Sequence, residues 1–292
     1  MESSTRLICP APAKLNLFLH VVGQKSDGYH LLQTLFRFID LQDTLHFSLR
    51  EDGAVHRTHP VDGVIEEQDL CVRAAHLLKN ETGCPLGVDI AVEKRIPMGG
   101  GLGGGSSDAA TTLIALNRLW SLDLPRKRLM ELGLRLGADV PVFVFGDNAF
   151  AEGVGEALQV FPLQEAWYVV LFPPVHVPTA QIFARPELTR NTVSITMRAL
   201  SDGRFFGEKF QRPQLRNDLQ PVVCGLYPEV ERHLTWLGGF GEAKMTGSGA
   251  CVFAEFGDHR QADAVFQQLP QGMRGVVAQG LARHPLRDWL RD

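Results

Sequence analysis

Hydrophobic and polar residues alternate strictly near the start of the chain. Over residues 14–21, KLNLFLHV, an apolar side chain occupies every second position on one face. A period of two residues predicts a β-strand with one buried face. The opposite face, which we expect to be open, carries Lys14, Asn16, Phe18 and His20.

Further alternating and helical patterns follow along the chain. Strands are predicted at 44–49, 88–96, 167–172, 250–256 and 275–278. Apolar residues at helical spacing predict helices at 69–79, 107–120, 126–137, 192–200, 219–237 and 262–269. After the third of these helices, ADVPVFVFG at 138–146 predicts a short loop that leads into an apolar segment. Because strands and helices are mixed without repeated β-α units, the pattern predicts an α+β fold.

The length of the chain indicates two domains. A single hydrophobic core rarely organises as many as 292 residues. The pattern restarts at Trp167, after a polar stretch that follows the apolar segment. We therefore predict a first domain at residues 1–163 and a second at 164–292.

The net charge and the lengths of the apolar runs argue against nucleic acid and membranes as partners. Lys and Arg number 29 against 33 Asp and Glu, a net charge of −4. This balance gives no global attraction to nucleic acid or to an anionic membrane. The start of the chain lacks an apolar signal core, and the longest apolar runs, at 140–145 and 167–172, are too short to cross a bilayer. We expect a cytoplasmic protein with neither nucleic acid nor membrane as partner.

The cysteines give no indication of a metal site or of disulfides. They are odd in number and contain no C-x-x-C pair: Cys9, Cys71, Cys84, Cys224 and Cys251. This usage is typical of reduced thiols in a cytosol.

The most informative stretch is PMGGGLGGGSSDAA at 97–110, which follows a predicted strand and precedes a predicted helix. Glycines allow successive backbone N–H groups to approach a ligand closely, and the start of the helix adds partial positive charge. The hydroxyls of Ser106 and Ser107 can donate to phosphate oxygens or take part in Mg²⁺ coordination. The segment therefore predicts a polyphosphate site.

Three other interpretations of this stretch are less favoured. A Walker A motif is excluded because no lysine follows the last glycine. The dinucleotide pattern G-x-G-x-x-G is matched by Gly99, Gly101 and Gly104, but the preceding strand is half polar rather than fully buried. A flexible linker or plain packing turn would need neither the apolar Leu102 at its centre nor the helix that follows.

The segment resembles the central motif of the GHMP kinases, P-x-x-x-G-L-G-S/G-S-S/G-A/D-A. Two further motifs similar to those of the family occur in order, PAKLNLFLHV at 12–21 and KMTGSGACVFAEF at 244–256. The resemblance implies an N-terminal domain like domain 2 of ribosomal protein S5 and a ferredoxin-like C-terminal domain. It also implies ATP as phosphoryl donor, with Mg²⁺. The implied ATP-binding residues are Pro97, Met98, Gly99, Gly100, Gly101, Leu102, Gly103, Gly104, Gly105, Ser106, Ser107, Lys94 and Asp69.

The resemblance also implies two catalytic residues. Asp139, within GADVP, would accept the proton of the attacking hydroxyl, and Lys14 would hold Asp139 and the charge that develops on the phosphoryl group. From the residue pattern alone, Asp139 could instead cap a helix that begins at Val140. Lys14 could be a solvated charge on an edge strand, although Asn16 on the same face favours a directed polar surface.

Further matches, including DGYHLL at 27–32, PTAQIF at 178–183 and RNDL at 216–219, resemble the members of the family whose substrate carries a cytidine diphosphate. The acceptor is then expected to be a 2-hydroxyl of that substrate. The implied substrate-binding residues are Asn16, Tyr29, His30, Val154, Thr179, Phe183, Thr246 and Gly247. Without the resemblance, His30 and Phe183 would be assigned to ordinary packing.

Some expectations stay open from the sequence. Asp69 stands where the family usually has Asn, and an ionised Asp cannot donate to a base, so it could serve only as a helix N-cap. Lys94 could face the triphosphate or simply the solvent. Another GHMP activity, of homoserine or mevalonate type, or a non-catalytic nucleotide-binding module are the alternatives, and either a monomer or a homodimer is expected. The metal ligands cannot be named.

Overall fold

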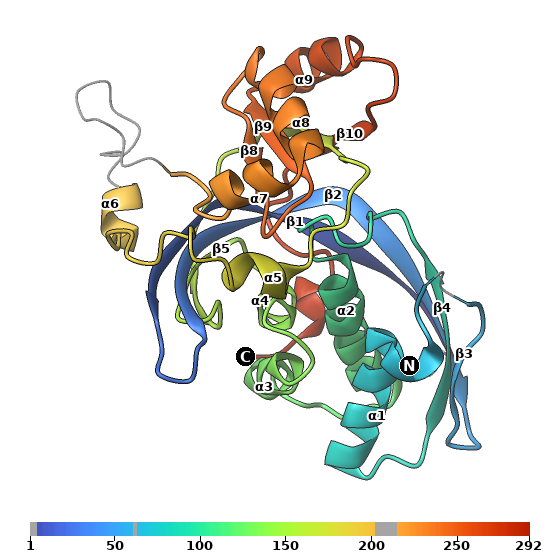
Figure 1. The fold of residues 1–292 in the computed structure, drawn as a ribbon. Coiled ribbons are helices and arrows are strands. Elements are labelled where there is room, and N and C mark those ends of the chain that lie inside the picture. Colours follow the sequence, from blue (N-terminus) through green and yellow to red (C-terminus); the bar gives the residue numbers. More distant parts are fainter. Residues whose placement is uncertain (1–4, 61–62, 202–214) are drawn as a thin grey trace.

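A computed structural model describes residues 5–60, 63–201 and 215–292 (Figure 1). The strands are β1 (Arg6–Gln24), β2 (His30–Arg50), β3 (Val55–Arg57), β4 (Gly87–Glu93), β5 (Ala149–Glu152), β6 (Ala157–Val160), β7 (Trp167–Leu171), β8 (Lys244–Met245), β9 (Val252–Phe256) and β10 (Gly275–Gln279). The α-helices are α1 (Leu70–Thr82), α2 (Gly104–Leu119), α3 (Arg126–Leu134), α4 (Val140–Phe145), α5 (Thr179–Phe183), α6 (Met197–Ser201), α7 (Gln220–Leu226), α8 (Pro228–Gly238) and α9 (His259–Phe266). The short 3₁₀ helices are η1 (Glu66–Gln68) and η2 (Arg287–Trp289).

The first sheet is built on the long antiparallel pair β1 and β2. Its order is β3-β4-β2-β5-β6, and β1 pairs with β2 along nearly its whole length, on the edge opposite β4 and β5. The sheet curves around helices α1 to α4, which lie on its concave side (Figure 1). Apolar residues of α2 such as Leu113 and Leu116 pack there against Phe38 and Phe47 of β2. This core holds the glycine-rich start of α2 against the sheet.

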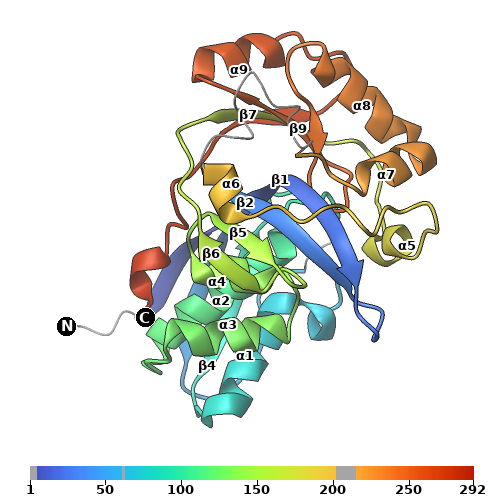
Figure 2. The ribbon, with the colours of Figure 1, turned by 90° about the vertical axis from the view of Figure 1, so that its left-hand side faces the viewer.

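The second sheet has the order β10-β7-β9-β8, with every neighbouring pair antiparallel. Numbered within its own domain, this is the order 4-1-3-2 of a ferredoxin-like sheet. Helices α8 and α9 cover its outer face, as Figure 2 shows. The predicted α+β fold and the ferredoxin-like second domain are confirmed.

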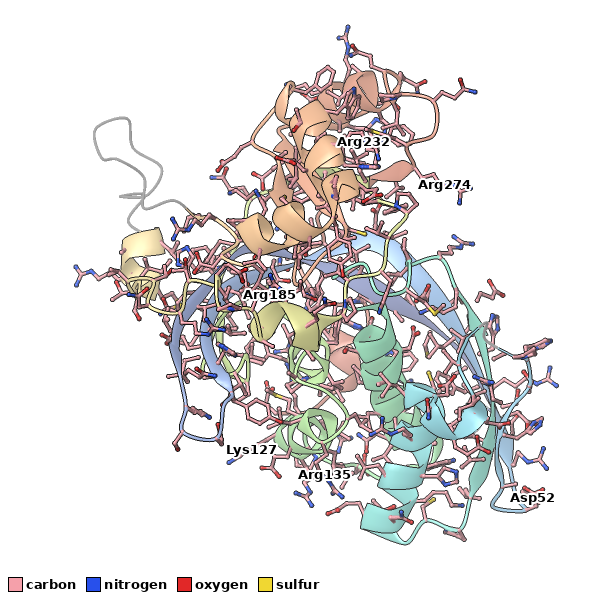
Figure 3. All side chains as sticks on the ribbon, viewed as in Figure 1. Asp52, Lys127, Arg135, Arg185, Arg232 and Arg274 are labelled. Carbon is pink, nitrogen blue, oxygen red and sulfur yellow. The ribbon has the colours of Figure 1, made fainter. Side chains whose placement is uncertain are left out.

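The two sheets face each other, so that the molecule has four layers in the order helices, sheet, sheet, helices (Figure 2). Ala13, Leu15 and Ile39 of the first sheet pack in one cluster with Tyr168 and Val170 of the second. Charged side chains such as Lys127 and Arg232 project from the outer surface (Figure 3). Strand β1, which carries Lys14, therefore lies in the middle of the molecule.

The open face predicted for β1 is wrong. Lys14, Asn16 and His20 are all buried. The alternation correctly predicts the strand, but a second sheet and the neighbouring loops cover the face that carries the polar residues. A pattern of alternation cannot reveal such cover, because it is contributed by residues distant in the sequence, such as Gly103 beside Lys14 and Thr246 beside Asn16.

The faces predicted for the far half of β1 are also wrong. The register of β1 against β2 shifts by one residue between Asn16 and Leu19, which marks a β-bulge. One extra residue exchanges the two faces of a strand. Leu19 therefore lines the same cavity as Asn16, whereas Phe18 packs into a separate apolar cluster.

Three predicted elements differ in detail. The apolar segment at 140–145, for which no type of element was predicted, is a short helix, α4. The helix predicted at 219–237 is divided into α7 and α8 at Tyr227, because Pro228 cannot continue the first helix. The helix predicted at 192–200 begins only at Met197.

The last residues of the chain return to the first domain. Leu286 and Leu290 belong to the core beneath the first sheet, and Leu281 N–H donates to Phe38 O at 2.8 Å. The boundary near residue 163 stays a prediction, but the C-terminal tail packs with the domain that precedes it. Among the described residues, no helix is both long and apolar enough to cross a membrane.

Candidate active site

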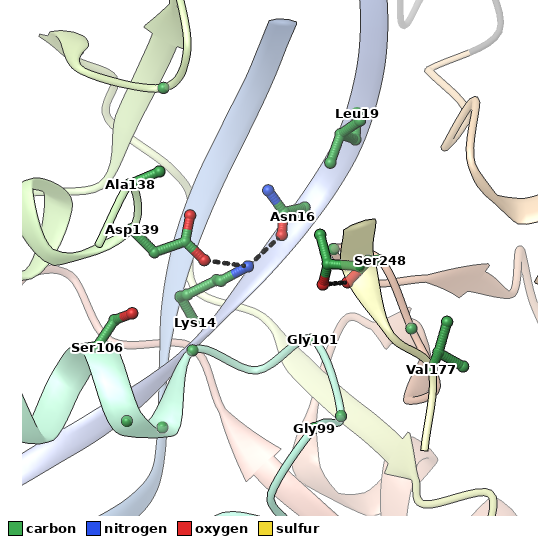
Figure 4. A pocket seen from close by; sticks show the side chains of 18 of the residues that line it. Lys14, Asn16, Leu19, Gly99, Gly101, Ser106, Ala138, Asp139, Val177 and Ser248 are labelled. Atoms are coloured by element: carbon green, nitrogen blue, oxygen red, sulfur yellow. Dashed lines mark hydrogen bonds and ion pairs between the residues drawn. The ribbon is translucent and has the colours of Figure 1, made fainter. Parts of the chain in front are cut away.

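A cavity of about 480 Å³ lies where the two domains meet. Its walls come from β1, the glycine-rich loop before α2, the start of α4, and the turns at 176–179 and 247–249 (Figure 4). The three sequence motifs that resemble one family therefore converge on a single site.

Lys14 and Asp139 form an ion pair in this cavity. Lys14 Nζ lies 3.2 Å from Asp139 Oδ2 and donates to Asn16 Oδ1 at 2.5 Å (Figure 4). The Lys14 ammonium also lies 5.5 Å from the centroid of the Phe36 ring. A buried ammonium is costly unless it is paired and hydrogen-bonded, and here both conditions are met.

Asp139 is positioned by the tight turn between α3 and α4. Val140 N–H donates to Gly137 O at 3.1 Å, and Pro141 occupies the first turn of α4. Although Asp139 is the N-terminal flanking residue of α4, its side chain makes no capping hydrogen bond. The interpretation of Asp139 as a helix cap is therefore wrong, and its carboxylate faces the cavity instead.

The glycine-rich loop takes a backbone that only glycine adopts readily. Gly99, Gly101 and Gly103 have φ of 69°, 75° and 73°, in the left-handed region. A Cβ on Gly101 would lie 2.2 Å from the carbonyl oxygen of Thr246, and one on Gly103 would lie 2.9 Å from the Phe143 ring. Substitution at these positions would push the loop away from the neighbouring strand.

Carbonyl groups of the loop bond to the protein. Gly100 O accepts from Cys251 N–H and Leu102 O accepts from Lys14 N–H, both at 3.0 Å. Within the described part of the chain, the N–H groups of residues 100–104 have no protein acceptor. Gly103 precedes α2 without a side-chain cap, so the first N–H groups of the helix are also available. Such an array of N–H groups favours an anion.

The serines after the loop have different positions. Ser106 lines the cavity. Ser107 is fully buried, and its hydroxyl donates to Pro12 O at 2.7 Å. Leu102 is likewise buried, where it anchors the loop in the cluster between the sheets. A direct contact with ATP thus stays a prediction for Ser106, whereas Ser107 and Leu102 lie outside the cavity and support the loop.

Thr246 joins the three motifs. Its hydroxyl oxygen accepts from Asn16 N–H at 2.9 Å, and the hydroxyl donates to Gly101 O at 3.3 Å. Thr246 is itself buried, and it is the next residue, Gly247, that lines the cavity. Asn217 Nδ2 donates to Gly247 O at 2.7 Å and so fixes the turn.

The structure brings some, but not all, of the residues predicted to bind the base of the substrate to the cavity. Phe183 lines the cavity, and the His30 ring lies 4.8 Å from it between centroids. Tyr29 is 67% exposed in the turn before β2 and does not line the cavity. Val154 and Thr179 do line it.

Arg190, a polar group in this region, was not predicted from the sequence, and Ser248 of the motif at 244–256 adds a second polar group. Arg190 Nε donates to His30 Nε2 at 3.1 Å, and Arg190 also donates to the carbonyl oxygens of Phe183, Arg185 and Leu188. Burial, and secondly the Arg190 charge, lower the pKa of His30. The hydroxyl of Ser248 shares a 2.6 Å hydrogen bond with Thr179 and lies on the cavity wall.

Lys94 and Asp69 are both held by charged partners. Lys94 lines the cavity, but its ammonium is bonded to Asp43 at 2.5 Å and to Asp108 at 2.6 Å. It is therefore not the freely solvated residue considered as an alternative. Asp69 caps α1 by accepting from Cys71 N–H and pairs with Arg57 at 3.0 Å. The cap is confirmed; Asp69 is outside the cavity wall, and its contact with adenine stays a prediction.

Across the described ranges, no cluster of three or more His, Cys, Asp or Glu side chains is arranged to hold a metal ion. The cavity wall carries oxygen groups with the hard character that Mg²⁺ prefers, among them the Asp139 carboxylate and the Ser106 hydroxyl. Because Mg²⁺ usually binds through one or two carboxylates and the phosphates of a nucleotide, these groups fit such an ion when a nucleotide is bound.

Comparison with family models and known proteins defines the class of this molecule. The model of the GHMP kinase N-terminal domain matches residues 69–147, and that of the GHMP kinase C-terminal domain matches residues 197–275. The chain belongs to the GHMP kinase family.

Similar proteins narrow the group further. The chain is 62% identical to a 4-diphosphocytidyl-2-C-methyl-D-erythritol kinase from Thiobacillus denitrificans, over 97% of this chain and 98% of the relative. It is 59% identical to a protein of the same name from Nitrosospira multiformis, over 100% of this chain and 97% of the relative. A crystal structure of 4-(cytidine 5'-diphospho)-2C-methyl-D-erythritol kinase superposes with a TM-score of 0.76 at 34% identity, covering 94% of this chain and 99% of that one.

A more distant similarity concerns the fold alone. The homoserine kinase from Cytophaga hutchinsonii superposes with a TM-score of 0.72 at 16% identity, covering 97% of each chain. The same two-domain framework thus carries acceptor sites of different chemistry.

Proposed function

We propose that this protein is an ATP-dependent kinase that phosphorylates the 2-hydroxyl of 4-diphosphocytidyl-2-C-methyl-D-erythritol, a step in the non-mevalonate route to isoprenoid precursors. The observation that carries the proposal is the Lys14–Asp139 pair at 3.2 Å, in one cavity with the glycine-rich start of α2. The relatives at 62% and 59% identity over nearly the full length bear this name.

The cavity would serve a phosphoryl transfer as follows. The free N–H groups of residues 100–104 and the start of α2 would bind the phosphates of ATP. The acceptor oxygen would form a bond to the γ-phosphorus as the bond to the β-γ bridging oxygen breaks, and ADP would leave. Asp139 would orient the acceptor hydroxyl and receive its proton, while Lys14 would offset the charge on the moving group. Mg²⁺, when bound with the nucleotide, would neutralise phosphate charge.

The base of the substrate would bind near Phe183 and His30. An aromatic ring stacks on a pyrimidine, and the neutral His30 ring offers a hydrogen bond. Tyr29, exposed in the turn before β2, stays a predicted contact of the base. A mevalonate or homoserine acceptor carries no base for these groups, so they favour the cytidine substrate.

A non-catalytic nucleotide-binding module is the less favoured alternative. Such a module has no need for a buried lysine in contact with a carboxylate that faces the ligand cavity. We place the protein in the cytoplasm, without a nucleic acid partner, as a monomer or a homodimer.

The test is turnover by the purified protein. ADP release would be coupled to a reporter reaction with ATP, Mg²⁺ and one of three acceptors: the cytidine substrate, mevalonate or homoserine. We expect release with the cytidine substrate only, and a new phosphate monoester in the ³¹P spectrum of the product. Release with mevalonate or homoserine at a comparable kcat/KM would contradict the assignment, and no release with any acceptor would favour the non-catalytic module.

A further inference from the structure

The segment that leads into the glycine-rich loop is tied to one buried carboxylate, that of Asp43 on β2. Asp43 Oδ1 accepts from the backbone N–H of Arg95 at 2.5 Å and of Ile96 at 2.8 Å. Asp43 Oδ2 accepts from Lys94 Nζ at 2.5 Å. Three consecutive residues immediately before Pro97 are thus bonded to a single side chain that is 0% exposed.

The place of Asp43 in the sheet connects the loop to the catalytic strand. Asp43 is paired with Ala11 of β1, three residues before Lys14. At the far end of the loop, Lys14 N–H donates to Leu102 O at 3.0 Å. The ribbon of β1 and β2 therefore holds the loop at both ends, through Asp43 at its start and through the backbone of Lys14 near its end.

Neutralising Lys94 does not by itself require Asp43. Asp108 lies at 2.6 Å from the same ammonium and supplies a carboxylate already. Only Asp43 also accepts from backbone N–H groups of the loop entrance. Charge-assisted hydrogen bonds of this kind are the strong ones, and they fix geometry as well as energy.

We infer that Asp43 is a positioning residue for the phosphate donor: it fixes the entrance of the glycine-rich loop, so that the N–H groups of residues 100–104 face the polyphosphate. Asp43 does not line the cavity, and it acts through the backbone of Arg95 and Ile96. The inference rests on the proposed function in so far as that loop binds ATP.

Three variants separate this role from others. Asp43→Ala removes all three acceptor bonds. Asp43→Asn keeps an acceptor oxygen for the two backbone N–H groups but removes the charge beside Lys94. Asp108→Asn removes the other carboxylate that pairs with the Lys94 ammonium, which lies at nearly the same distance as that of Asp43. It leaves the hydrogen bonds between Asp43 and the backbone intact, so it is the matched control for charge.

The readouts are KM for ATP, KM for the acceptor, the melting temperature, and amide hydrogen exchange at residues 94–103. Because small displacements of a phosphate loop weaken every contact with the nucleotide, we expect Asp43→Ala to raise KM for ATP about tenfold or more. KM for the acceptor should stay within about twofold, and exchange at Arg95 and Ile96 should accelerate. Asp43→Asn should restore KM for ATP to within about threefold of the original enzyme, and Asp108→Asn should leave it within about twofold.

Other outcomes would contradict the positioning role of Asp43. If Asp43→Ala lowers the melting temperature while KM for ATP stays unchanged, Asp43 has only a structural role. If Asp43→Asn and Asp108→Asn raise KM for ATP as much as Asp43→Ala does, charge beside Lys94 is the cause. Should Asp43→Ala not fold, Asp43→Ser takes its place, since its short neutral side chain cannot span both N–H groups. The exchange measurement needs no turnover, so failure of the proposed function leaves this test intact.

Discussion

The Lys14 ammonium lies 3.2 Å from the Asp139 carboxylate, and the two side chains differ in exposure, 2% for Lys14 against 38% for Asp139. Lys14 is held by Asn16 from one side and by Asp139 from the other, so it has a fixed position. Asp139 keeps part of its carboxylate open to the cavity. The pair therefore combines a rigid positive charge with an acceptor that a substrate hydroxyl can reach.

Asp139→Asn should abolish proton acceptance while keeping the shape of the site. We expect kcat to fall by about 10²- to 10⁴-fold, the usual contribution of a general base. The dissociation constant of ATP should stay near its original value, because the phosphate-binding N–H groups are untouched. Steady-state kinetics and calorimetric ATP titration measure the two quantities, and Asp123→Asn, on an exposed loop, is the control. An unchanged kcat would remove Asp139 from the mechanism.

Lys14→Met removes the fixed charge and leaves Asp139 without a partner. A loss of kcat of about 10²-fold or more is expected from removing one preorganised electrostatic group. Lys14→Arg should not restore activity, since the lysine side chain runs between Gly103 and Gly247, where added Cβ atoms would lie 3.1 and 3.3 Å from it. The exposed Lys127→Met is the control (Figure 3). Recovery of activity in Lys14→Arg would show that the site is wider than the structure indicates.

Gly101→Ala should destabilise the protein more than its backbone strain alone predicts. Gly101 and Gly272 both have positive φ, 75° and 92°, but a Cβ on Gly272 meets nothing within 4 Å. Strain of this kind costs about 1–3 kcal/mol, and Gly272→Ala should show only that cost. Gly101→Ala adds the overlap with Thr246 O, so we expect a larger loss in chemical denaturation and a raised KM for ATP. Equal losses in the two variants would mean that the loop moves freely.

Arg190→Gln should impair the site for the base without affecting ATP. The guanidinium can only donate, so the His30 nitrogen that faces it must be unprotonated. Burial and the Arg190 charge lower the pKa of His30, and removing the charge should raise that pKa in an NMR titration of the ring. KM for the cytidine substrate should increase several-fold while KM for ATP is unchanged. Arg185→Gln, at a half-buried arginine that pairs with Glu187, is a control for charge nearby, and an unmoved His30 pKa would contradict the interpretation.

His284 should make the fold sensitive to acid. Burial lowers the pKa of His284 to about 3, whereas an unfolded histidine has a pKa of about 6.5. As the pH falls below about 6.5, the unfolded chain binds a proton that the folded chain does not, so stability is lost progressively until the pH reaches about 3. His284→Asn keeps a hydrogen-bonding side chain beside Leu286 N–H but cannot titrate. Its free energy of unfolding should decline less between pH 6.5 and 4 than that of the original protein; a parallel decline would assign the acid sensitivity to other groups.

The sequence predicts best those features that depend on neighbouring residues. The strand predicted at 14–21 and the glycine-rich turn before a helix are both present in the structure, because strand periodicity and loop chemistry are local. The motif resemblance also places Lys14, Asp139 and Phe183 at one cavity. The division of the helix at Pro228 had a visible signal, since proline ends a preceding helix.

Other features depend on distant parts of the chain and have no local signal. The bulge between Asn16 and Leu19 follows from the pairing with β2, and the burial of Lys14 follows from distant groups of both domains, such as Gly103 and Gly247. Asp43 lies in a polar stretch, LQDTLHF, that reads as an ordinary strand, yet it holds a loop more than 50 residues later. Arg190 is likewise identified only once His30 is seen beside it.

The return of the C-terminal tail to the first domain has a consequence for biosynthesis. Leu286 and Leu290 complete a core whose other members lie between Cys9 and Ala151. Domains commonly fold in order as they leave the ribosome, but this first core lacks its closing residues until residues 286–290 have been synthesised. The nascent chain must therefore carry an unfinished hydrophobic surface through the synthesis of the whole second half, and a prematurely terminated chain would expose it permanently.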